Sequence, residues 1–252
     1  VGKSITLKHL KEDGYDAIFI CSGAGLPKMM NIPGENLNGV YSANEFLTRV
    51  NLMGAEGTDS VTPLRVGKAA AIIGGGNVAM DAARTAVRVG FEKVYIVYRR
   101  TEAELPARLE EIRHAKEEGV IFQFLHAPVE IYNKDGYAAG MKFEIMELGE
   151  PDESGRRKPV GTGRYTDLDV DSVIVALGTG PNPIIQKSAH LDGLDFEVDS
   201  KGYFTVNPET RETSIPAIFA GGDVAPVGTS NAINAMGAGK KAAKAINEYL
   251  RQ

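Results

Sequence analysis

The sequence predicts an α/β fold built around a βαβ unit, and three observations support this prediction. An apolar run at residues 68–73 ends in three glycines, a helical pattern follows at once over 77–89, and a second apolar run occupies 93–98. A strand, a glycine turn, a helix and a strand in this order form the βαβ unit of parallel sheets. The composition agrees, because 29 glycines, 7% aromatic residues and no tryptophan suit a chain with many tight turns.

The chain of 252 residues suits one large domain or two modest ones, and we expect two lobes. The first lobe begins with residues 16–21 (DAIFIC), which predict a buried parallel strand ending in a glycine turn. Gly23 and Gly25 begin like a phosphate-binding turn, but Pro27 follows, and residues 26–39 are turn formers where such a turn needs a helix. We therefore expect a loop after this strand.

Four helices are predicted by period and by end signals. They cover residues 43–52, 77–89, 104–118 and 230–249. The side chains expected on one face are Phe46, Leu47 and Val50 in the first helix and Val78, Ala82, Ala86 and Val89 in the second. Pro106 suits the first turn of the third helix, Gly119 suits its end, and residues 54–63 have the composition of a linker.

The remaining pattern predicts strands. Residues 120–125 and 170–177 are apolar runs typical of buried strands. Residues 129–148 alternate as two antiparallel strands joined at 133–136, and residues 151–163 are a charged stretch with proline and glycine that predicts a loop. The hairpin is expected to embellish the βαβ unit.

The glycine turn after residue 73 carries the strongest functional signal. Gly74, Gly76 and Ala79 fill the small positions of G-x-G-x-x-[GA] between a strand and a helix. These positions permit a tight turn, close approach of a pyrophosphate and close helix packing, so the helix N-terminus meets the anion. The residues predicted to contact a nicotinamide dinucleotide here are Gly74, Gly75, Gly76, Asn77 and Val78. The alternative is a glycine turn with a structural role only.

The end of the second strand indicates which nicotinamide dinucleotide binds. A site for NAD usually places an acidic residue here, whereas a site for NADP supplies arginine. Tyr98, Arg99 and Arg100 stand where the acid would be. Two guanidinium groups beside a 2′-phosphate could each contribute on the order of 1.5 to 3 kcal/mol. We therefore predict NADPH, the alternative being that the two arginines pair with Glu102 and Glu104.

A second strand-and-glycine pattern lies near the C-terminal end. Residues 215–224 (IPAIFAGGDV) place an apolar strand before Gly-Gly-Asp, and a helix rich in small residues follows. In a flavin site, Asp223 could accept hydrogen bonds from ribityl hydroxyls. The alternative is that Asp223 is a turn former or a helix N-cap.

Taken together, these motifs resemble the family of the glutamate synthase small (β) subunit, a family of flavoproteins that use pyridine nucleotides. The matching segments are GGGNVAMDAARTAVRVG, VYRRTEAELPAR, LGTGPNP, AIFAGGDV and CSGAGLPKMMNIPGENLNGVYSANEFLTRVNLM. The last of these is close to the form in single-chain glutamate synthases and in the large subunit of the NADH-dependent ferredoxin:NADP oxidoreductase. The resemblance spans nearly all of the chain.

The resemblance implies a Rossmann-like NADP-binding domain inserted into an FAD-binding domain. It places residues 1–61 and 173–252 in the FAD-binding lobe and residues 62–172 in the NADP-binding domain. The cofactor-binding residues that it adds are Ser22, Gly23, Gly178, Thr179, Gly222 and Asp223. Members pass a hydride from NADPH to FAD and need ring alignment more than an acid or a base, so no catalytic residue is nominated.

Three departures separate the chain from the family pattern, and the first two point to a C-terminal portion of a longer protein. The chain has no N-terminal G-x-G-x-x-G for the FAD pyrophosphate and no cysteines for iron-sulfur clusters, and Cys21-Ser22-Gly23 replaces the usual Ala-Thr-Gly. We expect FAD in the full-length protein, with its pyrophosphate turn upstream of Val1. The expected partners are an upstream iron-sulfur and FAD region, a large glutamate synthase or ferredoxin-linked subunit, and a second copy of the chain.

Composition narrows the remaining classes of function. A net charge of −5 without clusters of basic residues argues against nucleic acid. The single cysteine, Cys21, excludes an intrachain disulfide and is expected to be buried in its strand rather than to do thiol chemistry. No membrane span or signal peptide is visible, so a cytoplasmic location is expected. The rival from another class is a non-catalytic dinucleotide-binding or redox-sensing domain.

Overall fold

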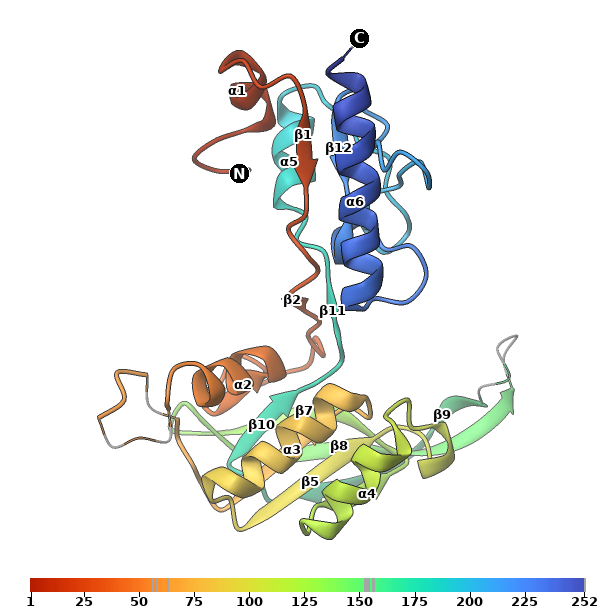
Figure 1. The fold of residues 1–252 in the computed structure, drawn as a ribbon. Coiled ribbons are helices and arrows are strands. Elements are labelled where there is room, and N and C mark those ends of the chain that lie inside the picture. The colour runs from red at the N-terminus through yellow and green to blue at the C-terminus, as the bar shows by residue number, and fades with distance from the viewer. Residues whose placement is uncertain (56, 58, 63, 152–154, 156, 252) are drawn as a thin grey trace. The chain divides into compact units, whose positions relative to one another are not determined.

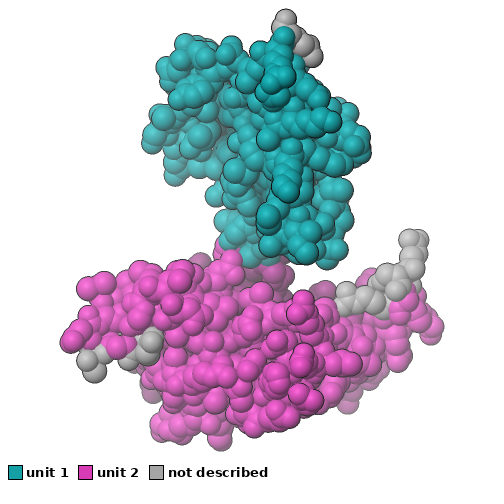
Figure 2. Space-filling model, viewed as in Figure 1, with its two compact units in different colours: residues 1–26, 179–252 teal, residues 27–178 magenta. Residues whose placement is uncertain are grey.

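The computed structural model describes residues 1–55, 57, 59–62, 64–151, 155 and 157–251. The chain forms two compact units (Figure 2). Unit 1 combines Val1–Leu26 with Thr179–Gln252, and unit 2 is the continuous segment Pro27–Gly178. One unit is therefore inserted into the sequence of the other, with limits that differ from the predicted boundaries at 61/62 and 172/173.

Unit 2 is built on a five-stranded parallel sheet in the order β3-β10-β4-β5-β6. Its strands are β3 (Val40–Ser42), β10 (Ser172–Val175), β4 (Ala69–Ile73), β5 (Lys93–Tyr98) and β6 (Ile121–Phe124). β3 and β10 belong to the same sheet as β4 because Val173 of β10 is in register with both Val40 and Ala71. This pairing draws residues 27–61 into unit 2, although the family resemblance groups them with the FAD-binding lobe.

Helices cover one face of this sheet and a second sheet covers the other. The helices are α2 (Ala43–Asn51), α3 (Asn77–Val89) and α4 (Leu109–Glu117), and the antiparallel strands are β7 (His126–Lys134), β8 (Tyr137–Pro151) and β9 (Arg157–Leu168) (Figure 1). Ile72 packs with Phe46 and Met80 in one core cluster. Ile73 packs with Phe143 in another, because successive residues of a strand face opposite sides.

Unit 1 has a smaller parallel sheet, in which Ile20 of β1 is in register with Ala220 of β12. Its elements are α1 (Leu7–Glu12), β1 (Ile18–Ile20), α5 (Ile184–Leu191), β12 (Ile218–Ala220), the 3₁₀ turn η2 (Gly222–Val224) and α6 (Ala232–Tyr249). β2 (Leu26–Pro27) and β11 (Thr179–Gly180) pair where the chain passes from one unit to the other. None of the described helices is long and apolar enough to cross a membrane.

The structure confirms the predicted βαβ unit, because β4, α3 and β5 follow one another at the expected residues. The helix predicted over 104–118 begins later than expected. The 3₁₀ turn η1 (Glu102–Glu104) ends at Leu105, whose backbone is extended. The residue before a proline avoids the helical region, so Pro106 lies ahead of the helix and α4 starts at Leu109.

The loop predicted over 151–163 is wrong for the described residues from 157 onward. β9 pairs with β8 from Arg157 opposite Pro151 to Leu168 opposite Met141. Most residues of β9 are exposed. An antiparallel strand with a solvated face can be polar and charged, and that composition resembles a loop in the sequence.

Two expectations about burial are also wrong. Val78 does not share the buried face of α3, because it lies in the first turn with 44% of its surface exposed. The buried residues of this helix are Ala79, Met80, Ala82, Ala83 and Ala86. Cys21 is exposed, since β1 ends at Ile20 and the cysteine begins the following loop.

Candidate functional site: a dinucleotide cavity in unit 2

The glycine turn after β4 begins at Gly74, where the surrounding backbone leaves no room for a side chain. Gly74 has a φ of +147°, and a Cβ built on it would lie 2.3 Å from the carbonyl oxygen of Ala176. The N–H group of Gly74 donates to the carbonyl oxygen of Val97 at 3.1 Å. The turn is therefore held between the ends of β10 and β5, and a non-glycine residue would be strained there.

The next two glycines have different surroundings. A Cβ on Gly75 would lie within 3 Å of the side chains of Leu105 and Tyr98, whereas a Cβ on Gly76 would meet no atom within 4 Å. Gly76 is the N-cap of α3 and supplies no side chain to cap it. The first amides of a helix have no partner within the helix, so the start of α3 presents N–H groups and a positive dipole end at an open point.

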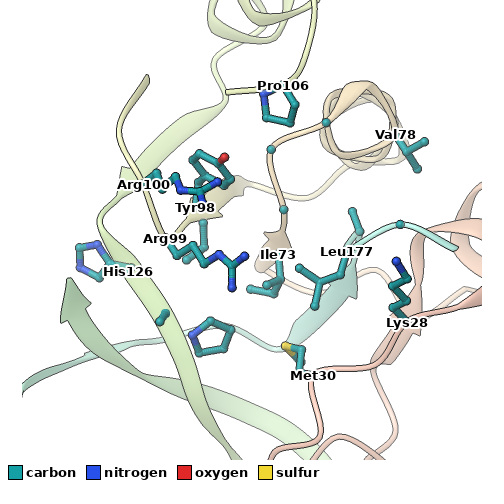
Figure 3. Close-up of a pocket in the computed structure, with 18 of the residues that line it drawn as sticks. Lys28, Met30, Ile73, Val78, Tyr98, Arg99, Arg100, Pro106, His126 and Leu177 are labelled. Carbon is teal, nitrogen blue, oxygen red and sulfur yellow. The ribbon is translucent and has the colours of Figure 1, made fainter. Parts of the chain in front are cut away.

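This turn lines a cavity of about 750 Å³ (Figure 3). The walls are the turn itself, the end of β5, the start of β7, the ends of the strands β4 and β10, and the segment Lys28 to Met30. Of the predicted cofactor-binding residues, the cavity brings together Gly74, Gly75, Gly76, Asn77, Val78, Arg99, Arg100 and Gly178. The carboxyl ends of parallel strands are where open α/β sheets bind ligands, and the volume is in the range of small-molecule sites.

Both arginines after β5 line the cavity. No salt bridge to Arg99 or Arg100 is found among the described residues. Glu102 instead pairs with Lys116 at 2.6 Å, and Glu104 accepts hydrogen bonds from Thr101. The structure therefore does not show the alternative in which these two glutamates neutralise the arginines.

Glu104 supports the segment that follows the arginines. The main-chain N–H and the hydroxyl of Thr101 both donate to the Glu104 carboxylate. The Thr101 hydroxyl holds the pKa of Glu104 below its ordinary value of 4.5. The Tyr98 hydroxyl donates to the main-chain oxygen of Glu104 at 2.9 Å. These bonds fix the chain on both sides of Arg99 and Arg100.

The cavity is also lined by residues that the sequence did not indicate as cofactor-binding, among them Lys28, Met30, Pro106 and His126. Nδ1 of His126 lies 2.6 Å from the carbonyl oxygen of Phe124. A carbonyl only accepts, so Nδ1 carries the proton, and in the neutral ring Nε2 is an acceptor. His126 lies two residues after β6, the strand next to β5. Its position beyond the carboxyl end of a parallel strand is the signal that could have indicated it as a cavity residue.

The other predicted cofactor residues lie in unit 1. Ser22 and Gly23 follow β1, and Gly222 and Asp223 follow β12. Because these strands are parallel neighbours in register, the two loops leave the same edge of the sheet. Thr179 lies in β11.

The glycine turn at Gly222 and Asp223 in unit 1 is the turn that the sequence predicts to contact FAD. Gly222 has a φ of +72°, and a Cβ built on it would meet nothing closer than 3.9 Å. Asp223 is exposed, and its carboxylate accepts no hydrogen bond from the described residues, so it can accept bonds from hydroxyl groups. α6 is capped by its own Asn231, which accepts from the N–H of Asn234. The cavity at this turn is only about 10 Å³.

No group of three metal-ligating side chains is found in the described part of the chain. A parallel sheet, a glycine turn at the carboxyl ends of its strands and a cavity lined by two arginines are the features of a dinucleotide-binding α/β protein. Residues 2–239 match the family model described as pyridine nucleotide-disulphide oxidoreductase. The chain belongs to this family.

Curated relatives are similar over the whole chain. The β subunit of the NADP(+)-dependent formate dehydrogenase of Moorella thermoacetica is 40% identical over 257 residues, which cover 100% of this chain and 34% of the relative. The small chain of the NADPH glutamate synthase of Escherichia coli K12 is 36% identical over 259 residues, which cover 99% and 53%. The chain thus spans about a third to a half of the length of these relatives.

Solved structures agree on the fold. FprA of Mycobacterium tuberculosis in complex with NADPH has a TM-score of 0.75 at 23% identity, covering 100% of this chain and 67% of that chain. The thioredoxin reductase of T. acidophilum has a TM-score of 0.66 at 19% identity, covering 94% and 66%. The α/β fold of the two-dinucleotide-binding flavoprotein type that the sequence predicts is therefore confirmed.

Proposed function

We propose that this chain is an NADPH-dependent oxidoreductase module that passes a hydride from NADPH to FAD, as in the electron-input part of glutamate synthase. The observation that carries the proposal is the cavity of unit 2, where the open side of Gly76 and the side chains of Arg99 and Arg100 line one space. A pyrophosphate and a 2′-phosphate are the two anionic groups that NADPH would bring to such a space.

The residues of unit 2 have separate roles in this proposal. Amides at the start of α3 bind the pyrophosphate next to Gly76, where no side chain intervenes. Arg99 and Arg100 bind the 2′-phosphate, and NADH lacks that group, so the pair determines the preference for NADPH. Gly178, at the end of the β10 strand, lines the same cavity.

Unit 1 is proposed to contact FAD. When bound, FAD accepts the hydride, which carries two electrons and one proton, that NADPH gives up. The Asp223 carboxylate would accept hydrogen bonds from ribityl hydroxyls, with Gly222, Ser22 and Gly23 beside it as open backbone at the same sheet edge. Thr179 would approach the flavin from the β11 segment.

The electron acceptor beyond FAD is the finer part of the proposal. Two of the relatives are a formate dehydrogenase subunit and a glutamate synthase chain. A third is the β subunit of an NADPH-Fe(3+) oxidoreductase of Geobacter sulfurreducens, which is 32% identical over 277 residues. This variety favours one shared step with different partners. We propose an iron-sulfur and flavin region, or a large subunit of glutamate synthase type, as the partner. The large subunit of an NADH-dependent ferredoxin:NADP oxidoreductase is the alternative.

An anaerobic flavin-reduction experiment tests the proposal. FAD is added to the purified chain, unbound flavin is removed, and NADPH or NADH is then added while visible absorbance is followed. We expect NADPH to bleach the bound flavin faster than NADH does. Binding of NADPH without any bleaching of retained flavin would favour the non-catalytic dinucleotide-binding or redox-sensing module.

A further inference from the structure

The arginine pair of the cavity is connected to the β8–β9 hairpin by a side-chain hydrogen bond. Nε of Arg100 donates to the main-chain oxygen of Arg157, the first residue of β9, at 2.8 Å. The main chain of Arg100 is also held, because its carbonyl oxygen accepts from the N–H group of Leu125 at 3.1 Å. Within the described chain the two terminal nitrogens of Arg100 donate no hydrogen bond, so they remain available to a ligand.

Arg157 is itself fixed by its own side chain. Its Nε donates to the carbonyl oxygen of Gly149 at 3.1 Å, and its Nη2 donates to that of Leu148 at 2.8 Å. The register of β8 against β9 shifts just after Leu148, and the residue opposite Leu148 is Pro159, which has no N–H group to donate. The Arg157 guanidinium therefore supplies donors where Pro159 has none, and it holds the start of β9 against β8.

We propose that Arg157 is a positioning residue for recognition of the ribose 2′-phosphate. It fixes the carbonyl oxygen that orients Arg100, and its own side chain is not among the residues lining the cavity. Its charge also contributes to the lowered pKa of Glu104, as the last of several causes. An arginine already held in its binding geometry loses less conformational entropy when the phosphate arrives. The β8–β9 hairpin thereby contributes to the choice of NADPH over NADH. This inference rests on the proposed function of unit 2.

The test compares two arginines of the same strand. Arg157→Ala removes the clamp on β8 but keeps the carbonyl oxygen that faces Arg100. Arg164→Ala is the matched control, because Arg164 is an exposed residue of β9 whose partner is Glu147 at 3.2 Å. Both variants lose one positive charge. Affinities for NADPH and NADH are measured by calorimetry for each variant and for the unchanged chain.

We expect Arg157→Ala to weaken NADPH binding roughly five- to tenfold, with NADH binding unchanged. Arg164→Ala should leave both affinities unchanged. In an Arg100→Ala background, adding Arg157→Ala should cause no further loss, because Arg157 acts through Arg100. Unchanged NADH binding also reports that the glycine turn remains folded.

Three results would overturn the inference. NADPH affinity that does not change in Arg157→Ala would show that the clamp does not matter. An equal loss for NADPH and NADH would show a general structural role, and a full further loss in the Arg100→Ala background would show that Arg157 contacts the cofactor. These failures are separable from failure of the proposed function, in which the unchanged chain would not bind NADPH or Arg100→Ala would not weaken it.

Discussion

Two glycine turns of this chain follow parallel strands and precede helices, but they differ in what surrounds them. In unit 2 the turn at Gly74 follows the central strand of a five-stranded sheet, and five residues of α3 are buried. In unit 1 the turn at Gly222 follows a two-stranded sheet, and α6 buries Ala242 alone among its described residues. The cavities at the two turns are about 750 and 10 Å³. The comparison indicates that the size of the surrounding sheet decides whether a strand-glycine-helix pattern lines a cavity large enough for a ligand.

The largest expected effect comes from filling the turn of unit 2. Gly76→Val places a side chain in open space, at a residue whose backbone is already extended, so the fold should be retained. The side chain would occupy the place proposed for the pyrophosphate, and we expect at least a hundredfold loss of NADPH affinity, about 2.7 kcal/mol. Calorimetric titration together with thermal unfolding measures both effects.

Gly74→Ala is the contrasting variant of the same turn. Its Cβ would meet the Ala176 carbonyl oxygen at a φ of +147°, so this substitution should lower the stability of the fold itself. If the Gly76→Val protein were stable and bound NADPH as tightly as the unchanged chain, the turn of unit 2 would have a structural role only. The proposed difference between the two turns would then be wrong.

The dinucleotide unit could be predicted from the sequence because its signals are local. The apolar runs that become β4 and β5 are bounded by glycine and by charge, and the periodic helix between them has its glycine stop at Gly90. Spacing alone predicts different roles for Gly74 and Gly76, and the structure shows different surroundings, because a Cβ on Gly74 would clash with Ala176 whereas one on Gly76 would lie in open space.

The rest of the site could not be predicted, because it depends on pairing between distant segments. β3 has three residues and no strand signal of its own, and it is defined by its pairing with β10. β9 is polar because one of its faces is solvated. His126 enters the cavity through the order of the strands, and a local pattern contains no information about that order.

A smaller effect, on stability rather than on binding, is expected from a substitution in unit 1. Arg211 is only 1% exposed, and its guanidinium donates to the main-chain oxygens of Ala220 and Ala225 on either side of the turn at Gly222. Burial lowers its pKa. Arg211→Met keeps the apolar stem but leaves both carbonyl groups without this donor. We expect a loss of about 2 kcal/mol in the free energy of unfolding, measured by urea denaturation.

Lys244→Met, which removes an exposed cation of the same unit, is the control for Arg211. Binding of NADPH should be unchanged in both variants, since unit 2 contains none of these contacts. An Arg211→Met protein that is more stable than the unchanged chain would show that the cost of burying the charge outweighs its hydrogen bonds.

The smallest expected effect concerns the pH dependence of the segment after β5. The folded pKa of Glu104 is lowered by Thr101, so the ionised carboxylate stabilises the fold above its ordinary pKa of 4.5, and this contribution is lost as the pH falls through the lowered value. Glu104→Gln should therefore reduce the melting temperature slightly at neutral pH. The gap to the unchanged chain should close as the pH falls below that lowered pKa. A gap that is constant with pH would assign the effect to shape rather than charge.

We propose that unit 2 binds NADPH through its glycine turn and selects it through Arg99 and Arg100. The most direct test is a calorimetric titration of the chain with NADPH and, separately, NADH, repeated after both arginines are changed to serine. We expect NADPH to bind at least about tenfold more tightly than NADH and this preference to disappear in the double variant. Equal affinities in the unchanged chain, or a preference that survives the loss of both arginines, would contradict it.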